Sequence, residues 1–309
     1  MSPDRRSYER VEQALLDAEG VEAVARWVDL DRLGGRLRVL EAGSGPAVLM
    51  VPGVMTGGAV FASLVRYLPD FRCIMIDRPG VGLSPLADPP PTDIADFERV
   101  GDQLLVDVLD GLGLDRAHVV ATSQGAWSAY RSLAAHSERF VRMVGLAFQL
   151  GARVPKLPLS MRIPPIPFLT PKRVPANRWL VKKMLASTGM RSAIKSGKFS
   201  DELADWMAAL LRHTNTFRND SLHSPRPVEH SVELLARVEA PVHLFWGDDD
   251  LFGGEASAIE FASKLPSATV QMVPGAGHAP WIDEPELAVA AIRGHLLGEP
   301  NQNPAGRSN

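Results

Sequence analysis

The stretch Ala117-His118-Val119-Val120-Ala121-Thr122-Ser123-Gln124-Gly125-Ala126 joins an apolar run to a helical segment through a small-x-Ser-x-Gly turn. A serine at the apex of a sharp strand-to-helix turn has strained backbone geometry, so the residues two before and two after it must be small. Ala121 and Gly125 meet this requirement. The turn also places Ser123 at the start of the next helix, where free NH groups and the helix dipole favour developing negative charge. We interpret Ser123 as a candidate nucleophile. Because such pentamers also occur by chance, this interpretation needs support from the rest of the chain.

The composition is that of an ordinary globular enzyme. The 309 residues are 45% hydrophobic and 22% charged, with a formal net charge of -3, so nothing points to nucleic acid as a partner. The single cysteine, Cys73, excludes an intramolecular disulfide and a cysteine-based metal site, and its apolar neighbours predict a buried side chain. No run of 18 apolar residues occurs, and no apolar segment follows the charged N-terminus. We therefore expect a cytoplasmic protein without a membrane span.

Short apolar runs alternate with helical patterns along most of the chain. Runs that are apolar without alternation are typical of strands buried on both faces of a parallel sheet. The pattern therefore predicts an α/β fold with a doubly wound, mostly parallel sheet that opens on a hairpin around Gly34-Gly35. The expected strands are 25–30, 36–40, 47–51, 73–76, 117–122, 141–148, 241–246 and 269–273, and the expected helices are 5–18, a stretch ending at 68, 96–112, a stretch ending at 265, and 284–297.

The alternation stops after residue 150. Residues 151–175 contain seven prolines, and helical patterns without strands then continue to about residue 238. We predict an inserted helical cap at 151–238, a core formed by 1–150 and 239–298, and a disordered tail at 299–309. Residues 151–240 contain 15 Lys and Arg against 7 Asp and Glu, so the cap is basic. This charge is either a solvated helix surface or an entrance that attracts acidic substrates or a partner.

Three groups that can carry acyl-transfer chemistry follow predicted strands. Ser123, Asp250 and His278 stand at the carboxyl ends of successive predicted strands, which is where open α/β sheets place their sites. A serine hydroxyl is a weak nucleophile and needs a base, and His278, in a glycine-flanked loop, is the best placed of the eight histidines. A carboxylate would hold that histidine in the required tautomer. Asp248 and Asp249 are alternatives to Asp250 by proximity, with loop capping or a surface position as their other interpretation.

The order Ser, Asp, His and several further motifs resemble the α/β-hydrolase family over nearly the whole chain. Besides the Ser123 turn, the motifs are Gly43-Ser44-Gly45-Pro46, Pro52-Gly53, Asp77-x-x-Gly80-x-Gly82-x-Ser84, Gly247-x-x-Asp250 and Gly275-x-Gly277-His278. The resemblance favours Asp250 as the acid and implies that the backbone NH groups of Val54 and Gln124 form an oxyanion hole. Two departures are Pro52, where the family usually has histidine, and Ala121, where it usually has glycine. They put the detailed geometry of the oxyanion loop and of the elbow in question.

Apolar residues near these motifs are candidates for a substrate pocket, although core packing explains each of them equally well. They are Met55, Trp127 and Trp281, together with Ile163, Ile166, Phe168 and Leu169 in the proline-rich segment.

The sequence thus predicts a serine hydrolase without metal or cofactor that cleaves a carboxylic ester or related small-molecule acyl substrate, acidic or hydrophobic, through an acyl-enzyme. The same triad also serves carbon–carbon bond hydrolases, lactonases, thioesterases and cofactor-free perhydrolases. Family dehalogenases and epoxide hydrolases have aspartate at the nucleophile position, so Ser123 disfavours those activities.

From a different class, a ligand-binding protein without turnover remains an alternative. A dinucleotide-binding enzyme is disfavoured because Gly80-x-Gly82 lacks the third glycine of that fingerprint. The natural substrate and the oligomeric state are not fixed by the sequence.

Overall fold

The computed structural model describes residues 2–154, 166–185, 194–195, 199–223 and 228–299. Its centre is an eight-stranded sheet in the order β1-β2-β4-β3-β5-β6-β7-β8. The first two strands form the predicted antiparallel hairpin, β2 also pairs antiparallel with β4, and the pairs from β4 to β8 are parallel. The doubly wound, mostly parallel sheet is therefore confirmed. The strands are β1 Val24–Asp29, β2 Arg36–Ala42, β3 Ala47–Val51, β4 Arg72–Ile76, β5 Ala117–Thr122, β6 Phe140–Gln149, β7 Val242–Gly247 and β8 Ala268–Val273.

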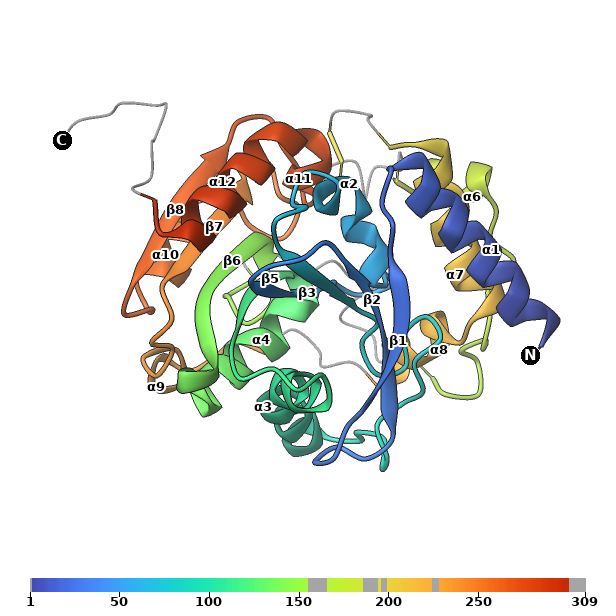
Figure 1. Ribbon diagram of the computed structural model, residues 1–309, viewed down its shortest axis with the longest axis horizontal. Coiled ribbons are helices and arrows are strands. Elements are labelled where there is room, and N and C mark those ends of the chain that lie inside the picture. Colours follow the sequence, from blue (N-terminus) through green and yellow to red (C-terminus); the bar gives the residue numbers. More distant parts are fainter. Residues whose placement is uncertain (1, 155–165, 186–193, 196–198, 224–227, 300–309) are drawn as a thin grey trace.

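Helices cover both faces of this sheet, as Figure 1 shows. Successive residues of β3 explain why: Val48 and Met50 join one buried apolar cluster, and Leu49 and Val51 join the other. Because side chains alternate along a strand, a central strand must be apolar on both faces when helices cover both. The first cluster includes residues of α1 Pro3–Ala18, α2 Ala62–Val65, α11 Pro280–Asp283 and α12 Pro285–Leu297, and the second includes residues of α3 Ile94–Gly111, α4 Ser123–Ala135, α9 Val232–Leu235 and α10 Glu255–Ala262.

Local sequence signals set many of the helix ends. Ser2 accepts a hydrogen bond from the NH of Arg5 at the start of α1, and Asp93 accepts one from Asp96 at the start of α3. Pro285 opens α12, and Gly298 ends it in the left-handed conformation. The predicted helix ending at 68 is shorter than expected, with a 3-10 turn, η1 Gly58–Phe61, before the single turn of α2. The short helix α11 was not predicted.

The helical insertion between β6 and β7 is present. Its described helices are α6 Arg178–Leu185, α7 Asp201–His213, α8 Thr216–Leu222 and α9. The described part of the proline-rich segment, 166–175, contains no helix or strand. Helix α7 packs on α1, where Trp206 Nε1 donates to Tyr8 Oη at 3.2 Å and Tyr8 Oη donates to Glu12 at 3.0 Å. Glu12 in turn pairs with the buried Arg38 of β2, so the first helix connects the insertion to the core.

The structure also bears on two smaller predictions, the burial of Cys73 and the expectation about membrane spans. Cys73 is fully buried in β4, as predicted, and burial raises the pKa of its thiol to about 12. Across the described ranges, no helix has the length and apolar character needed to span a bilayer.

Candidate active site

Ser123 lies at the sharp turn between β5 and α4 that the small-x-Ser-x-Gly pattern predicts. Its φ is 50°, a left-handed conformation that costs a non-glycine residue about 1–3 kcal/mol. A Cβ on Gly125 would approach the carbonyl oxygen of Pro52 to 2.5 Å and that of Val51 more closely still, so only glycine fits there. A Cβ on Gly53 would lie 3.0 Å from the Cβ of Ser123. The turn after β3 therefore packs directly against the Ser123 side chain.

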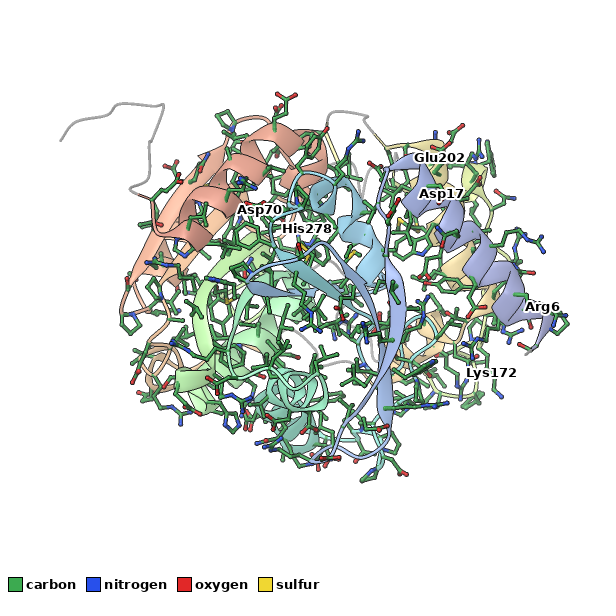
Figure 2. All side chains as sticks on the ribbon, viewed as in Figure 1. Arg6, Asp17, Asp70, Lys172, Glu202 and His278 are labelled. Atoms are coloured by element: carbon green, nitrogen blue, oxygen red, sulfur yellow. The ribbon has the colours of Figure 1, made fainter. Side chains whose placement is uncertain are left out.

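Asp250 and His278 are hydrogen-bonded to each other beyond the ends of β7 and β8. The distance from Asp250 Oδ2 to His278 Nδ1 is 2.8 Å, and the Asp250 side chain is fully buried. A carboxylate only accepts hydrogen bonds, so Nδ1 carries the hydrogen and Nε2 is left as an acceptor. Figure 2 shows His278 toward the middle of the molecule, while Arg6, Lys172 and Glu202 lie at its periphery.

Backbone NH groups complete the surroundings of Asp250. The NH of Phe148 donates to Oδ2 at 2.9 Å, and the NH of Phe252 donates to Oδ1 at 3.0 Å. The ring of Phe252 also meets the His278 ring edge to face, with centroids 4.8 Å apart. These contacts fix both side chains of the pair.

The two alternative aspartates have other contacts. Asp248 accepts a hydrogen bond from the NH of Gly275 at 2.9 Å, and Asp249 pairs with Lys195. Of the three neighbouring aspartates, Asp250 is therefore the one that contacts His278.

The strand that separates β5 from β7 also contributes to the site. The sequence pattern put the three candidate groups after successive strands, but β6 lies between β5 and β7. The NH of Leu150 donates to the carbonyl oxygen of Ser123 at 3.0 Å, and Phe148 donates to Asp250. The end of β6 thus links the elbow to the acid. Among the hydrogen bonds of the described residues, none joins Ser123 Oγ to His278. Catalytic hydrogen bonds of this kind often tighten only in the complex with substrate.

On the other side of Ser123 is the turn after β3 that contains Val54. Met55 has a φ of 57°, and its NH donates to Asp220 Oδ2 at 2.6 Å. Among the described residues, the NH groups of Val54 and Gln124 have no hydrogen-bond partner, so both remain available as donors. Neither Asp220 nor its contact with this turn was predicted.

The candidate pocket residues lie in different environments. Trp127 is 1% exposed and stacks on His230 with ring centroids 5.4 Å apart, and Trp281 is buried beside Phe61. Trp127 also lines a small cavity together with Gln124. Met55 packs against the apolar cluster of the inserted helices. In the proline-rich segment, Phe168 is 84% exposed, Ile166 and Leu169 are also exposed, and Ile163 lies outside the described residues.

A family model described as the alpha/beta hydrolase family matches residues 48–292, which include Ser123, Asp250 and His278. The chain belongs to the alpha/beta hydrolase family. Two sequence relatives are named as hydrolases. One is a putative carbamate hydrolase, RutD, of Caulobacter sp. (strain K31), 26% identical over 84% of this chain and 95% of that protein. Another, from Paraburkholderia phymatum, is a 2-hydroxy-6-oxononadienedioate/2-hydroxy-6-oxononatrienedioate hydrolase, 26% identical over 84% of this chain and 91% of the relative.

Solved structures of family members share the fold. Carboxylesterase CesB (YbfK) from Bacillus subtilis superposes with a TM-score of 0.77 at 19% identity, covering 97% of this chain and all of the other. The 2-hydroxy-6-oxo-6-phenylhexa-2,4-dienoate hydrolase from Rhodococcus sp. strain RHA1 gives a TM-score of 0.68 at 17% identity, covering 90% and 99%. These superpositions show the shared fold, and the family model shows that the chain is an enzyme of the alpha/beta hydrolase fold.

Proposed function

We propose that the protein is a serine hydrolase that cleaves a carboxylic ester or related acyl substrate through an acyl-enzyme, with Ser123, His278 and Asp250 as its triad. The observation that carries this proposal is the buried carboxylate of Asp250 bonded to His278 Nδ1, at the same sheet edge as a serine in a strained elbow. Fold alone does not specify an activity, but this combination is the arrangement that nucleophilic acyl transfer requires.

In the first half of the reaction, Ser123 Oγ attacks the acyl carbon while His278 Nε2 accepts the hydroxyl proton. Asp250 stabilises the resulting imidazolium, and the backbone NH groups of Val54 and Gln124 donate to the oxyanion of the tetrahedral intermediate. His278 then gives the proton to the leaving oxygen, and the acyl group stays on Ser123.

In the second half, water attacks the acyl-enzyme. His278 accepts a proton from that water and returns it to Ser123 Oγ when the ester bond breaks. The acid leaves and the enzyme is regenerated. Helix α4, which begins at Ser123, directs its free NH groups and dipole toward the developing charge in both halves.

The deciding experiment is intact-mass measurement after exposure to a fluorophosphonate probe. We expect one adduct on the native chain, none on Ser123→Ala, and at most slow labelling of His278→Ala. Ser137→Ala is the control and should be labelled like the native chain. With an ester substrate, Ser123→Ala should lose about a millionfold in turnover. No adduct on a folded native chain would contradict the proposal and favour a ligand-binding protein.

A second candidate is hydrolysis of a carbon–carbon bond in a dicarboxylate by the same triad. Several relatives, at 24–26% identity, are named as hydrolases of 2-hydroxy-6-oxononadienedioate, and the insertion is basic, with 15 Lys and Arg against 7 Asp and Glu over residues 151–240. A basic entrance would attract a dianionic substrate. Comparing kcat/KM for that dienedioate with kcat/KM for 4-nitrophenyl butyrate decides between the two candidates: a higher value for the dienedioate, falling as salt is added, favours the second.

A further inference from the structure

A buried ion pair contacts the turn that carries the predicted oxyanion donor. Arg78, which follows β4, donates from Nε to the carbonyl oxygen of Pro52 at 2.9 Å and from Nη2 to that of Gly53 at 2.8 Å. The same Nη2 lies 3.2 Å from Asp220 Oδ2. Asp220 belongs to α8 of the insertion and accepts the hydrogen bond from Met55 at 2.6 Å. Both side chains are buried, so water competes little for these contacts.

This turn needs support from outside its own backbone. Pro52 has no NH to donate, and Met55 is held in the left-handed region at a φ of 57° without being glycine. One local hydrogen bond, from Thr56 Oγ1 to the carbonyl oxygen of Gly53 at 3.0 Å, stabilises its far end. The bond from Met55 to Asp220 is what fixes the residue directly after Val54.

Helix α8 is in turn fixed to the core at two positions that precede Asp220. Asn219 Nδ2 donates to the carbonyl oxygen of Gly80 at 2.9 Å, and the NH of Gly82 donates to Thr216 Oγ1 at 2.9 Å. The loop that contains these glycines follows Arg78 directly. The position of Asp220 is therefore set by the same loop that sets the position of Arg78.

We propose that Asp220 is a positioning residue of the hydrolase: from the inserted helix α8, and together with Arg78, it holds the turn from Pro52 to Met55 in the conformation that lets Val54 stabilise the oxyanion. The inference rests on the proposed function, since it assigns a role relative to that reaction. This role makes the insertion part of the catalytic apparatus, because the turn that contains Val54 has all its contacts only when α8 is in place. Asp220 itself need not touch the substrate.

The test compares Asp220→Ala with Ser221→Ala, its neighbour on the same helix. Ser221 takes no part in the contacts that join α8 to the turn or to the loop after Arg78. We expect Asp220→Ala to lower kcat about 100-fold, because small displacements of catalytic groups have effects of that size, while KM changes by less than about twofold. Ser221→Ala should keep the native kcat. Equal kcat values for Asp220→Ala and Ser221→Ala would overturn the inference.

A double variant separates positioning from stability. Arg78→Met combined with Asp220→Leu replaces the buried ion pair by apolar side chains of similar size, a change that is often neutral for folding. We expect this variant to melt close to the native temperature and yet to show the same loss in kcat and a slower reaction with the fluorophosphonate probe. A folded double variant with native kcat would overturn the inference. Labelling of Ser123 in the native chain is measured in parallel, so that a failure of the proposed function, with no adduct anywhere, is distinguished from a failure of this inference alone.

Discussion

The two sides of Ser123 are held in place by different kinds of contact. On the proposed acid–base side, Asp250 is fixed by backbone NH groups of Phe148 and Phe252, which lie beside the ends of neighbouring strands. On the proposed oxyanion side, the turn that contains Val54 is fixed by the side chains of Arg78 and Asp220, which are 142 residues apart in sequence.

This difference determines which substitutions each side tolerates. Backbone donors are present whatever the side chain is, so the surroundings of Asp250 form whenever β6 and β7 pair. The oxyanion side depends on one carboxylate of an inserted helix and on how that helix is seated. We therefore expect the acid–base side to be sensitive only at Asp250 and His278 themselves, and the oxyanion side to be sensitive to changes within the insertion.

The substitution that we expect to lower kcat most on the acid–base side is Asp250→Asn. Within the described part of the chain, the three hydrogen-bond partners of this carboxylate are NH groups, namely those of Phe148, Phe252 and His278 Nδ1. An amide NH₂ group at this position faces either the NH of Phe252 or the NH groups of Phe148 and His278 Nδ1. In the first orientation two donors oppose each other, in the second His278 is forced toward the wrong tautomer, and in both the charge that would stabilise the imidazolium is lost. We expect kcat to fall about 10³–10⁴-fold, measured with an ester substrate under saturating conditions.

The matched control for this variant is Asp248→Asn. It makes the same chemical change two residues away, where the carboxylate accepts a hydrogen bond from Gly275 and does not contact His278. Turnover should stay within about twofold of native, because surface substitutions away from the site have small effects. A loss in Asp248→Asn as large as that in Asp250→Asn would show that the loop, and not the contact with His278, matters.

A substitution at Gly125 tests the junction between the two sides. A Cβ at this position would collide with the carbonyl oxygens of Val51 and Pro52, and so push the elbow away from the oxyanion turn. We expect Gly125→Ala to lower the free energy of unfolding by about 2–3 kcal/mol in denaturant titrations, and to reduce kcat as well. Gly113→Ala is the control: φ at Gly113 is +65°, but a Cβ there meets nothing within 4 Å, so it introduces backbone strain of about 1 kcal/mol without a collision. Equal losses of unfolding free energy in the two variants would show that backbone strain, and not collision, destabilises both variants.

Much of this architecture follows from local sequence patterns. Alternating patterns around Gly34-Gly35 predicted the first two strands, and short apolar runs predicted the other six. The small residues around Ser123 indicated the elbow, because the collision that excludes a Cβ at Gly125 is a local consequence of the turn. Glycine-flanked His278 and the spacing to Asp250 indicated the pair whose hydrogen bond the structure shows.

Contacts between distant segments could not be read in the same way. The helical pattern around Asp220 does not predict the hydrogen-bond partners of its carboxylate. These partners, Met55 and Arg78, lie in the core, far from Asp220 in sequence. The bend near the end of β6 was also missed: Ala147 has a φ of 64°, a conformation that its residue type does not signal. Gln149 Nε2 donates to the carbonyl oxygens of Leu146 and Ala147 around this bend, a local contact that the residue types do not signal either.

The smallest effect we predict separates acid inactivation of the site from acid unfolding of the sheet. His118 lies in β5, where burial, together with the charge of Arg142, lowers its pKa from 6.5 to about 4. Below pH 6.5 the unfolded chain binds a proton at this position and the folded chain does not, so stability is lost as the pH falls toward 4. Between pH 7.5 and pH 5 this amounts to about 2 kcal/mol. In His118→Leu, the difference between the unfolding free energies measured at these two pH values should shrink by about that amount. The pH dependence of kcat should be the same as in the native chain. An unchanged pH dependence of stability in this variant would show that His118 is not a source of the acid sensitivity of the fold.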